Sequence, residues 1–213
     1  MMRSARRLAT LAHAGATLFA ALVAALLVAC DDPSLDRLLD ALPDEAPGFP
    51  PGEVHRPGQP CVACHSPYGG VEPELSVGGT VFAVPKDDSE APFMLEGYAV
   101  RLVDSEGETR VLRTNRCGNF LSKKADWDPA FPLRAELYQV PRDDQPDVLV
   151  QDSVMASRIG RDGSCAGCHI HPKSPFSPGV VEALKVDASV EPPNDCPPPW
   201  LGPDPRLPEI SAQ

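Results

Sequence analysis

The stretch Tyr98-Ala99-Val100-Arg101-Leu102-Val103 places Tyr98, Val100 and Leu102 at every second position, with the charged Arg101 between the last two. Alternation of this kind is typical of a β-strand that buries one face. Short runs rich in Val, Leu, Thr and aromatic residues also occupy 80–84, 109–114, 133–140 and 148–151, and turn-forming residues separate them. This spacing predicts a mainly β fold, a small antiparallel β-sandwich over residues 76–155.

The order of these runs resembles that of carboxypeptidase-regulatory-like, or transthyretin-like, β-sandwich domains. The matching residues are Gly79-Thr80-Val81, Ala99-Val100-Arg101-Leu102-Val103-Asp104 with Gly107, and Thr114-Asn115 followed by Gly118-Asn119-Phe120. The resemblance covers about 80 residues and implies a binding or spacing module without chemistry of its own.

The pattern C-x-x-C-H occurs on both sides of the predicted sandwich, as Cys61-Val62-Ala63-Cys64-His65 and as Cys165-Ala166-Gly167-Cys168-His169. This is the pattern of c-type haem attachment, in which two thiols form thioethers to the haem and the next His binds the iron. The sequence therefore predicts two covalently bound haem c groups, held in loop-rich segments at 61–75 and 156–189. The thioether cysteines are Cys61, Cys64, Cys165 and Cys168, and the proximal iron ligands are His65 and His169.

Two further histidines are candidates for the far faces of the irons. His55 and His171 complete a set of four His outside the N-terminal segment, the number that two bis-His irons need. His171 follows His169 by two residues and can hardly reach the far face of the same iron. We therefore expect crossed ligation, with His171 on the first haem and His55 on the second, and the two motifs side by side. Met94 and Met155 are the competing sixth ligands.

A haem-free interpretation of the two Cys pairs also exists. Each pair could form a local disulfide or a thiol redox pair, although a thioredoxin-like site would need a βαβ context that the sequence lacks. A zinc site from all four cysteines would need the pairs to lie closer together in the sequence than Cys61 and Cys165 do.

The N-terminal segment 1–29 is basic at its start and continues as a mostly apolar run from Leu8 to Ala29. The run ends in Leu27-Val28-Ala29-Cys30, which resembles the bacterial lipobox and implies cleavage before a lipidated Cys30. The alternative is an uncleaved transmembrane helix. The acidic, Pro-rich stretch 30–60 is then an extended tether with one short amphipathic piece at 35–42. We expect an exported protein, anchored by lipid to a bacterial membrane.

Two cysteines remain, Cys117 and Cys196, and an exported protein can oxidise such a pair to a disulfide. Cys196 lies in the segment 190–213, which is Pro-rich, lacks periodicity and is predicted to be a flexible tail.

Charge limits the classes of partner. Three of the 19 Lys and Arg residues lie in 1–29, so the remaining chain has 16 basic against 30 acidic residues and a net charge of −14. Nucleic acid and anionic lipid surfaces are therefore not expected as partners. The acidic charge either favours a basic redox partner protein or serves only to keep the protein soluble.

These patterns together predict a lipid-anchored dihaem c-type cytochrome that transfers electrons with bis-His irons. One alternative is a haem enzyme, peroxidase-like or a nitrogen-oxide reductase, in which one iron keeps an open face. Another is a haem-free surface lipoprotein with disulfide-bonded Cys pairs. No catalytic triad or phosphate-binding loop accompanies these motifs in the sequence, so a hydrolase or nucleotide enzyme has no support. Because small ligands cannot bind an iron with His on both faces, an electron carrier is favoured over a catalyst.

Overall fold

The computed structural model describes residues 33–85, 90–140, 149–175, 177–184, 186 and 190–201. The chain divides into two compact units, residues 1–37 and 38–213. The predicted signal segment and Cys30 lie outside the described residues. Among the described residues, no helix is both long and apolar enough to cross a membrane.

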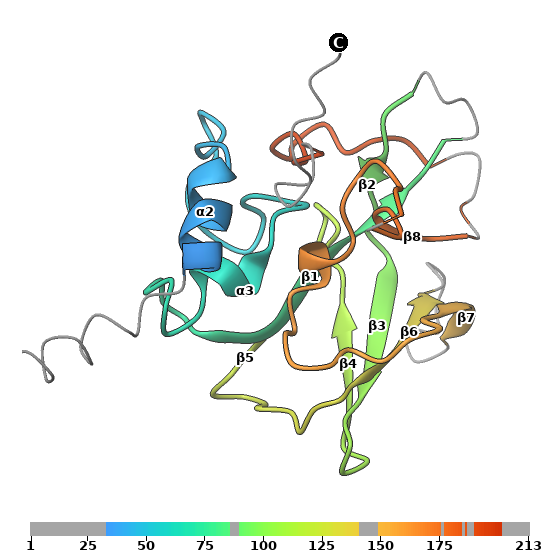
Figure 1. Ribbon diagram of the computed structural model, residues 1–213. Coiled ribbons are helices and arrows are strands. Elements are labelled where there is room, and N and C mark those ends of the chain that lie inside the picture. The colour runs from blue at the N-terminus through green and yellow to red at the C-terminus, as the bar shows by residue number, and fades with distance from the viewer. Residues whose placement is uncertain are drawn as a thin grey trace, which may run out of the picture. The chain divides into compact units, whose positions relative to one another are not determined.

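The second unit contains two β-sheets, drawn in Figure 1. One sheet has the strand order β2-β1-β5, with β8 pairing parallel to β1, and the other is an antiparallel sheet in the order β4-β3-β6-β7. The mainly β fold and the small antiparallel sandwich predicted from the sequence are confirmed. The strands are β1 Leu75–Ala83, β2 Phe93–Met94, β3 Tyr98–Val103, β4 Thr109–Arg113, β5 Asn119–Lys123, β6 Arg134–Gln139, β7 Val150–Val154 and β8 Val181–Glu182.

Helices are short and few in the described part of the chain. The helix α2 spans Pro33–Ala41 and contains most of the amphipathic piece expected in the tether. The helix α3, Cys61–Cys64, and the 3-10 helix Cys165–Gly167 each coincide with a C-x-x-C-H motif.

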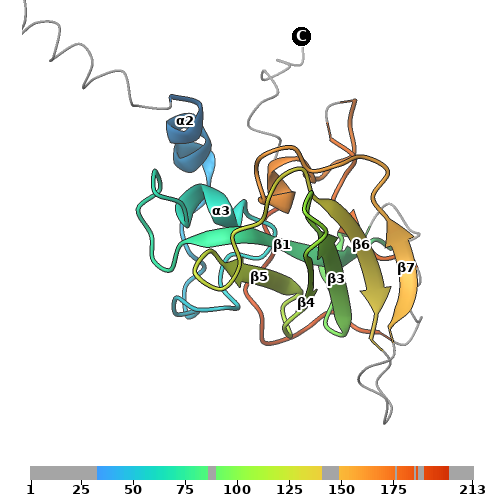
Figure 2. The ribbon, with the colours of Figure 1, turned by 90° about the horizontal axis from the view of Figure 1, so that it is seen from below.

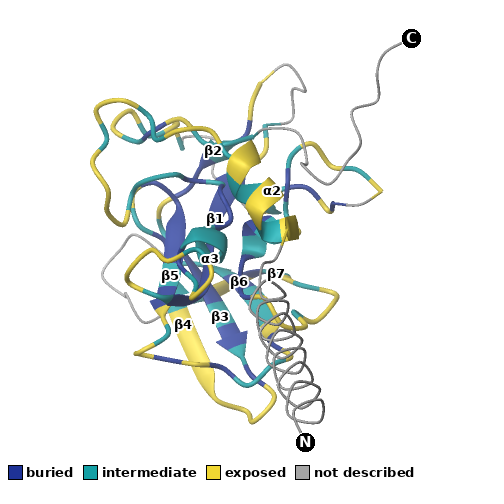
Figure 3. Ribbon diagram, turned by 60° about the vertical axis from the view of Figure 1, so that its left-hand side comes forward, coloured by how far each residue is buried: buried dark blue, intermediate teal, exposed yellow. Residues whose placement is uncertain are grey.

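All nine residues of β1 are buried, as the dark blue strand in Figure 3 shows. Val77, Val81 and Phe120 join the main apolar core, which also includes Leu102, Trp127 and Leu133. A strand covered on both faces shows no alternation of apolar and polar residues. For that reason the sequence pattern identified only the second half of β1, at 80–84.

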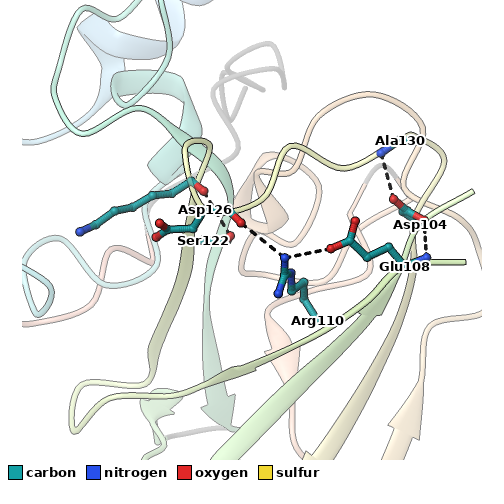
Figure 4. Close-up of polar contacts among 7 residues, drawn as sticks. Asp104, Glu108, Arg110, Ser122, Asp126 and Ala130 are labelled. Atoms are coloured by element: carbon teal, nitrogen blue, oxygen red, sulfur yellow. Dashed lines mark hydrogen bonds and ion pairs between the residues drawn. The ribbon is translucent and has the colours of Figure 1, made fainter. Parts of the chain in front are cut away.

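The turn between β3 and β4 is organised by the buried carboxylate of Asp104 (Figure 4). Its two oxygens accept hydrogen bonds from the backbone N–H groups of Glu106, Glu108 and Ala130, at 2.8–3.2 Å. Burial opposes ionisation of Asp104, but the backbone N–H donors outweigh it and lower the pKa of this carboxyl. Beside it, Arg110 pairs with Glu108 at 2.9 Å on the exposed surface.

The predicted disulfide between Cys117 and Cys196 is confirmed, with the two Cα atoms 5.6 Å apart. Residues 190–201, predicted as part of a flexible tail, are thereby fastened to the sandwich. An ion pair of 2.7 Å between Arg116 and Asp195 adds to the link. The backbone N–H of Trp200 also donates to the carbonyl of Pro57 at 2.9 Å. Residues 202–213 lie outside the described residues.

Candidate haem-attachment sites

The first motif folds as a single helical turn that ends at its histidine. The backbone N–H of His65 donates to the carbonyl of Cys61 at 3.0 Å, so the turn places the His directly after the two thiols. The imidazole of His65 is buried, and its Nδ1 lies 2.9 Å from the carbonyl oxygen of Pro73. A carbonyl only accepts hydrogen bonds, so Nδ1 is the donor here, and Nε2 is the ring nitrogen that this contact leaves for a metal.

The second motif repeats this arrangement with different residues. The backbone N–H of His169 donates to the carbonyl of Cys165 at 2.9 Å, and Nδ1 of His169 lies 3.0 Å from the carbonyl oxygen of Gly179. Burial lowers the pKa of His169, although its hydrogen bonds to the backbone oppose the shift. The imidazole is therefore neutral at pH 7, as a metal ligand must be.

A serine hydroxyl holds the chain downstream of the second motif. The Ser177 hydroxyl accepts from the N–H of Ile170 at 2.9 Å and lies 2.9 Å from the carbonyl oxygen of Cys168 and 2.7 Å from that of Ile170. It also accepts from the N–H of Gly179 at 3.2 Å. This network fixes the carbonyl of Gly179 relative to the motif, and thereby orients the ring of His169.

Both motifs pack against consecutive glycines in the middle of β1. A Cβ atom placed on Gly78 would lie 2.9 Å from Cβ of Cys61, and one placed on Gly79 would lie 2.7 Å from Cβ of Cys165. The second motif is also tied to the edge of this strand, since the N–H of Gly78 donates to the carbonyl of Gly163 at 3.0 Å. Figure 2 shows α3 and the second motif adjacent to β1. The structure therefore brings the two motifs together, although about 100 residues separate them in the sequence.

The thiols that face these glycines are weakly acidic. Burial raises the pKa of Cys61 to about 11, with a smaller contribution from the neighbouring Cys64. Burial also raises the pKa of Cys165 to about 12, and the nearby Cys61 is the next largest cause. Burial raises the pKa of Cys64, while Cys168 is exposed. In the haem-free fold the buried thiols are therefore protonated at neutral pH.

His55 lies beside the first motif, with its ring centroid 5.9 Å from that of His65 and the ring planes inclined by 47°. Nδ1 of His55 contacts the backbone of Gly52. Crossed ligation predicts that His55 approaches the second motif instead. The position of His55 favours ligation within the first motif, whereas the side-by-side placement of the motifs agrees with the expectation.

His171 lines a small, partly open hollow at the second motif. His169 contributes to the same hollow, and the fastened C-terminal segment forms part of its wall through Trp200. The other lining residues come from β1, the two motif segments and the start of β8, and are Gly58, Thr80, Phe82, Ala166, Val180 and Val181. The competing ligand Met94 is buried in the small strand β2 beside Phe82, and Met155 is half-buried directly after β7.

The described residues fit a haem c at each motif. Each motif supplies two thiols and one imidazole whose Nε2 is available, and each first Cys faces a glycine where any side chain would collide. The sequence pattern identified the thiols and the imidazoles. It missed the two glycines, because Gly78-Gly79 is also a turn signal, and it missed the carbonyls of Pro73 and Gly179, which carry no sequence signature.

No protein family, curated protein or solved structure matches this chain. Within the described ranges, no three His, Cys, Asp or Glu side chains gather in a way that could hold a metal ion by themselves.

Proposed function

We propose that this chain is a membrane-anchored dihaem c-type cytochrome that transfers electrons. The observation that supports it best is the repeated histidine geometry. In two motifs of different sequence context, the His after C-x-x-C donates a hydrogen bond from Nδ1 to a backbone carbonyl and leaves Nε2 available. When a His binds a metal through one ring nitrogen, a hydrogen bond from the other ring nitrogen orients the imidazole and raises its basicity.

The cysteines and histidines of the two motifs would have different roles in holding the haems. Cys61, Cys64, Cys165 and Cys168 would form the thioethers, and His65 and His169 would bind the irons through Nε2. When bound, each haem supplies one-electron redox chemistry at its iron. The buried strand β1 would exclude water from one side of each attachment site.

The ligands on the far faces would set the reduction potentials. We propose bis-His ligation of at least one of the two irons, with His55 and His171 as the candidate distal ligands. Imidazole on both faces gives lower potentials than a Met and His pair, and leaves no position for an external ligand.

Location and partner follow from the remaining sequence. Lipid on Cys30 would hold the exported protein at the surface of a bacterial membrane, because two or more acyl chains anchor stably where one does not. The acidic stretch directly after Cys30 would separate the haem domain from that surface. A net charge of −14 after residue 29, from 16 basic and 30 acidic residues, favours encounter with a basic redox partner protein.

Removing one thioether pair at a time tests the proposal. The double variants Cys61→Ser/Cys64→Ser and Cys165→Ser/Cys168→Ser are expressed with a c-type maturation system, and haem per protein is measured by pyridine haemochrome. We expect two haems in the wild type and one in each variant, with reversible reduction by dithionite. A wild type that carries none would contradict the proposal and favour the haem-free lipoprotein.

A haem enzyme is the second candidate, and one asymmetry favours it. His65 has a second imidazole within 6 Å of its ring, whereas the second motif shares its hollow with His171, only two residues from His169. An iron without a sixth protein ligand would bind peroxide or nitrogen oxides. A high-spin ferric signal from one haem, together with turnover of such a substrate, would support catalysis over simple electron transfer.

A further inference from the structure

We infer that His55 is the distal ligand of the haem on the first motif, and that Asn115 and Asn119 are the residues that position it. This inference rests on the proposed function, because it concerns the iron bound by His65. It replaces the crossed arrangement with ligation from the segment directly before the motif.

The spacing of the two rings agrees with a shared metal ion. Two imidazoles that face each other across one metal, each with a metal–nitrogen bond of about 2 Å, have ring centroids roughly 6 Å apart. The centroids of His55 and His65 are 5.9 Å apart. Nδ1 of His65 contacts the carbonyl of Pro73, and Nδ1 of His55 contacts both the N–H and the carbonyl of Gly52. The Nε2 atom of each ring is the one left for a metal.

Two asparagine amides hold the backbone of the His55 loop against the sandwich. Nδ2 of Asn119 donates to the carbonyl of His55 and to that of Glu53, each at 3.2 Å. Nδ2 of Asn115 donates to the same carbonyl of Glu53 at 2.7 Å. The loop that carries His55 is therefore not a free tether but a segment docked on the start of β5.

The amides are themselves fixed, so they can act as positioning groups. Asn119 is buried, with 7% of its surface exposed, and its Oδ1 accepts from the Thr80 hydroxyl of β1 at 2.7 Å. Asn115 Oδ1 accepts from the N–H groups of Cys117 and Asn119, which closes the turn before β5. These contacts run from β1, which carries the glycines at the motifs, through Asn119 to His55.

The loop between His55 and the motif adopts a conformation that needs such support. Arg56 has φ of 49°, a left-handed conformation that is uncommon for a residue with a side chain. Its guanidinium donates to the carbonyl of Pro43 at 2.8 Å and to Oε1 of Gln59 at 3.0 Å. This turn brings His55 back toward His65, ten residues later in the chain.

The assignment makes the two irons unequal. With His55 and His65 on one iron, His169 and His171 are the only other histidines after residue 29. Since His171 follows His169 by two residues, the far face of the second iron receives no imidazole from this chain. We expect one low-spin bis-His haem and one haem whose sixth position is filled by a different ligand or is open to carbon monoxide.

The test replaces His55 and His171 separately by Ala in the full-length protein, and measures haem content, the ferric electron paramagnetic resonance (EPR) spectrum and carbon monoxide binding. In His55→Ala we expect two haems still attached, loss of the bis-His low-spin signal and a gain of one carbon monoxide per protein. Added imidazole should restore the low-spin signal. In His171→Ala that signal should stay unchanged. Two attached haems with the signal intact in His55→Ala, or lost in His171→Ala, would overturn the assignment.

The positioning role is tested with Asn119→Ala and Asn115→Ala against the exposed control Asn194→Ala. We expect unchanged haem content in all three, and a high-spin fraction that grows in Asn119→Ala and Asn115→Ala and is absent in Asn194→Ala. Imidazole should restore the low-spin signal here too. If Asn119→Ala lowers the melting temperature and leaves the spin state unchanged, Asn119 is structural only. A wild type without haem would instead refute the proposed function itself.

Discussion

At the scale of single residues, the hydrogen-bond partners of the histidines determine which ring nitrogen is left to bind a metal. The motif histidines could be predicted as iron ligands from C-x-x-C-H alone. The carbonyls of Pro73 and Gly179, which contact Nδ1 of these histidines, could not be predicted. They lie eight and ten residues after the histidines, and every residue has a backbone carbonyl, so the sequence does not mark them. The same holds for His55, whose distance from His65 depends on amides 60 or more residues later in the chain.

Asp104 should make the free energy of unfolding of the sandwich depend on pH in the acidic range. Its pKa in the folded state lies below the unfolded value of 3.8, so its contribution is complete above that value and is lost as pH falls through the folded pKa. We expect Asp104→Asn to lower the melting temperature at pH 7 and to reduce the loss of stability between pH 5 and 3. Thermal melts across this range would measure it.

The exposed Asp126 provides the matched control, because its side chain takes no part in the turn between β3 and β4. Asp126→Asn should melt like the wild type at every pH. Parallel melting curves for Asp104→Asn and the wild type through the acid range would contradict the role given to Asp104.

At the scale of secondary-structure elements, β1 organises the molecule. The sequence pattern did not predict the first half of β1, Leu75–Gly79, or the strand β5. In both cases the alternation of apolar and polar residues is weak or absent. In β1 both faces are buried, so the period of two disappears. In β5 the buried positions include Asn119 and Ser122, which are polar and paired by hydrogen bonds, so the apolar signal is weak. The strand β3, with one face partly exposed, was predicted with its observed bounds.

The glycine pair of β1 should be intolerant of side chains. A Cβ on Gly79 would lie 2.7 Å from Cβ of Cys165 and 2.9 Å from Cζ of Phe120, in the packed core. We expect Gly79→Ala to destabilise the protein by about 1–3 kcal/mol and to reduce haem at the second motif selectively. Urea denaturation and haemochrome assays measure the two effects.

The companion variants define the specificity of this effect. Gly78→Ala should reduce haem at the first motif, because the added Cβ would lie 2.9 Å from Cβ of Cys61. Gly160 has no atom within 4 Å of an added Cβ, so Gly160→Ala should behave as the wild type. Equal haem content in Gly78→Ala, Gly79→Ala and Gly160→Ala would show that β1 does not shape the attachment sites.

At the scale of the whole molecule, the disulfide joins the C-terminal segment to the sandwich. It links residues 79 apart in the sequence, so the loop-closure estimate of its contribution is about 4.5 kcal/mol. We expect Cys117→Ser/Cys196→Ser to lower the urea midpoint and to expose Trp200, detected by fluorescence. A variant with the wild-type midpoint and emission would mean that the link contributes nothing to the fold.

The two haems should also interact, because their first cysteines face consecutive residues. Sγ of Cys61 and Sγ of Cys165 each lie 3.2 Å from a Cβ built on Gly78 or Gly79. Since consecutive Cα atoms are 3.80 Å apart, the two sulfurs lie within about 13 Å of each other. An electron on one haem then disfavours the addition of an electron to the other haem.

A spectroelectrochemical titration should therefore show two midpoint potentials. EPR signals of the fully oxidised protein should be broadened, and should sharpen when one haem is reduced. Signals that are identical in the oxidised and half-reduced states would indicate that the haems are too far apart to interact.

The proposed electron transfer requires two thioether-bound haems, and the intact mass of the purified mature protein reports whether they are present. We predict a chain that begins at Cys30, with the added mass of two haem groups and of the lipid, and with the two haems retained after denaturation. A mass that matches a chain without haem, with Cys61, Cys64, Cys165 and Cys168 as free thiols or disulfides, would contradict the account.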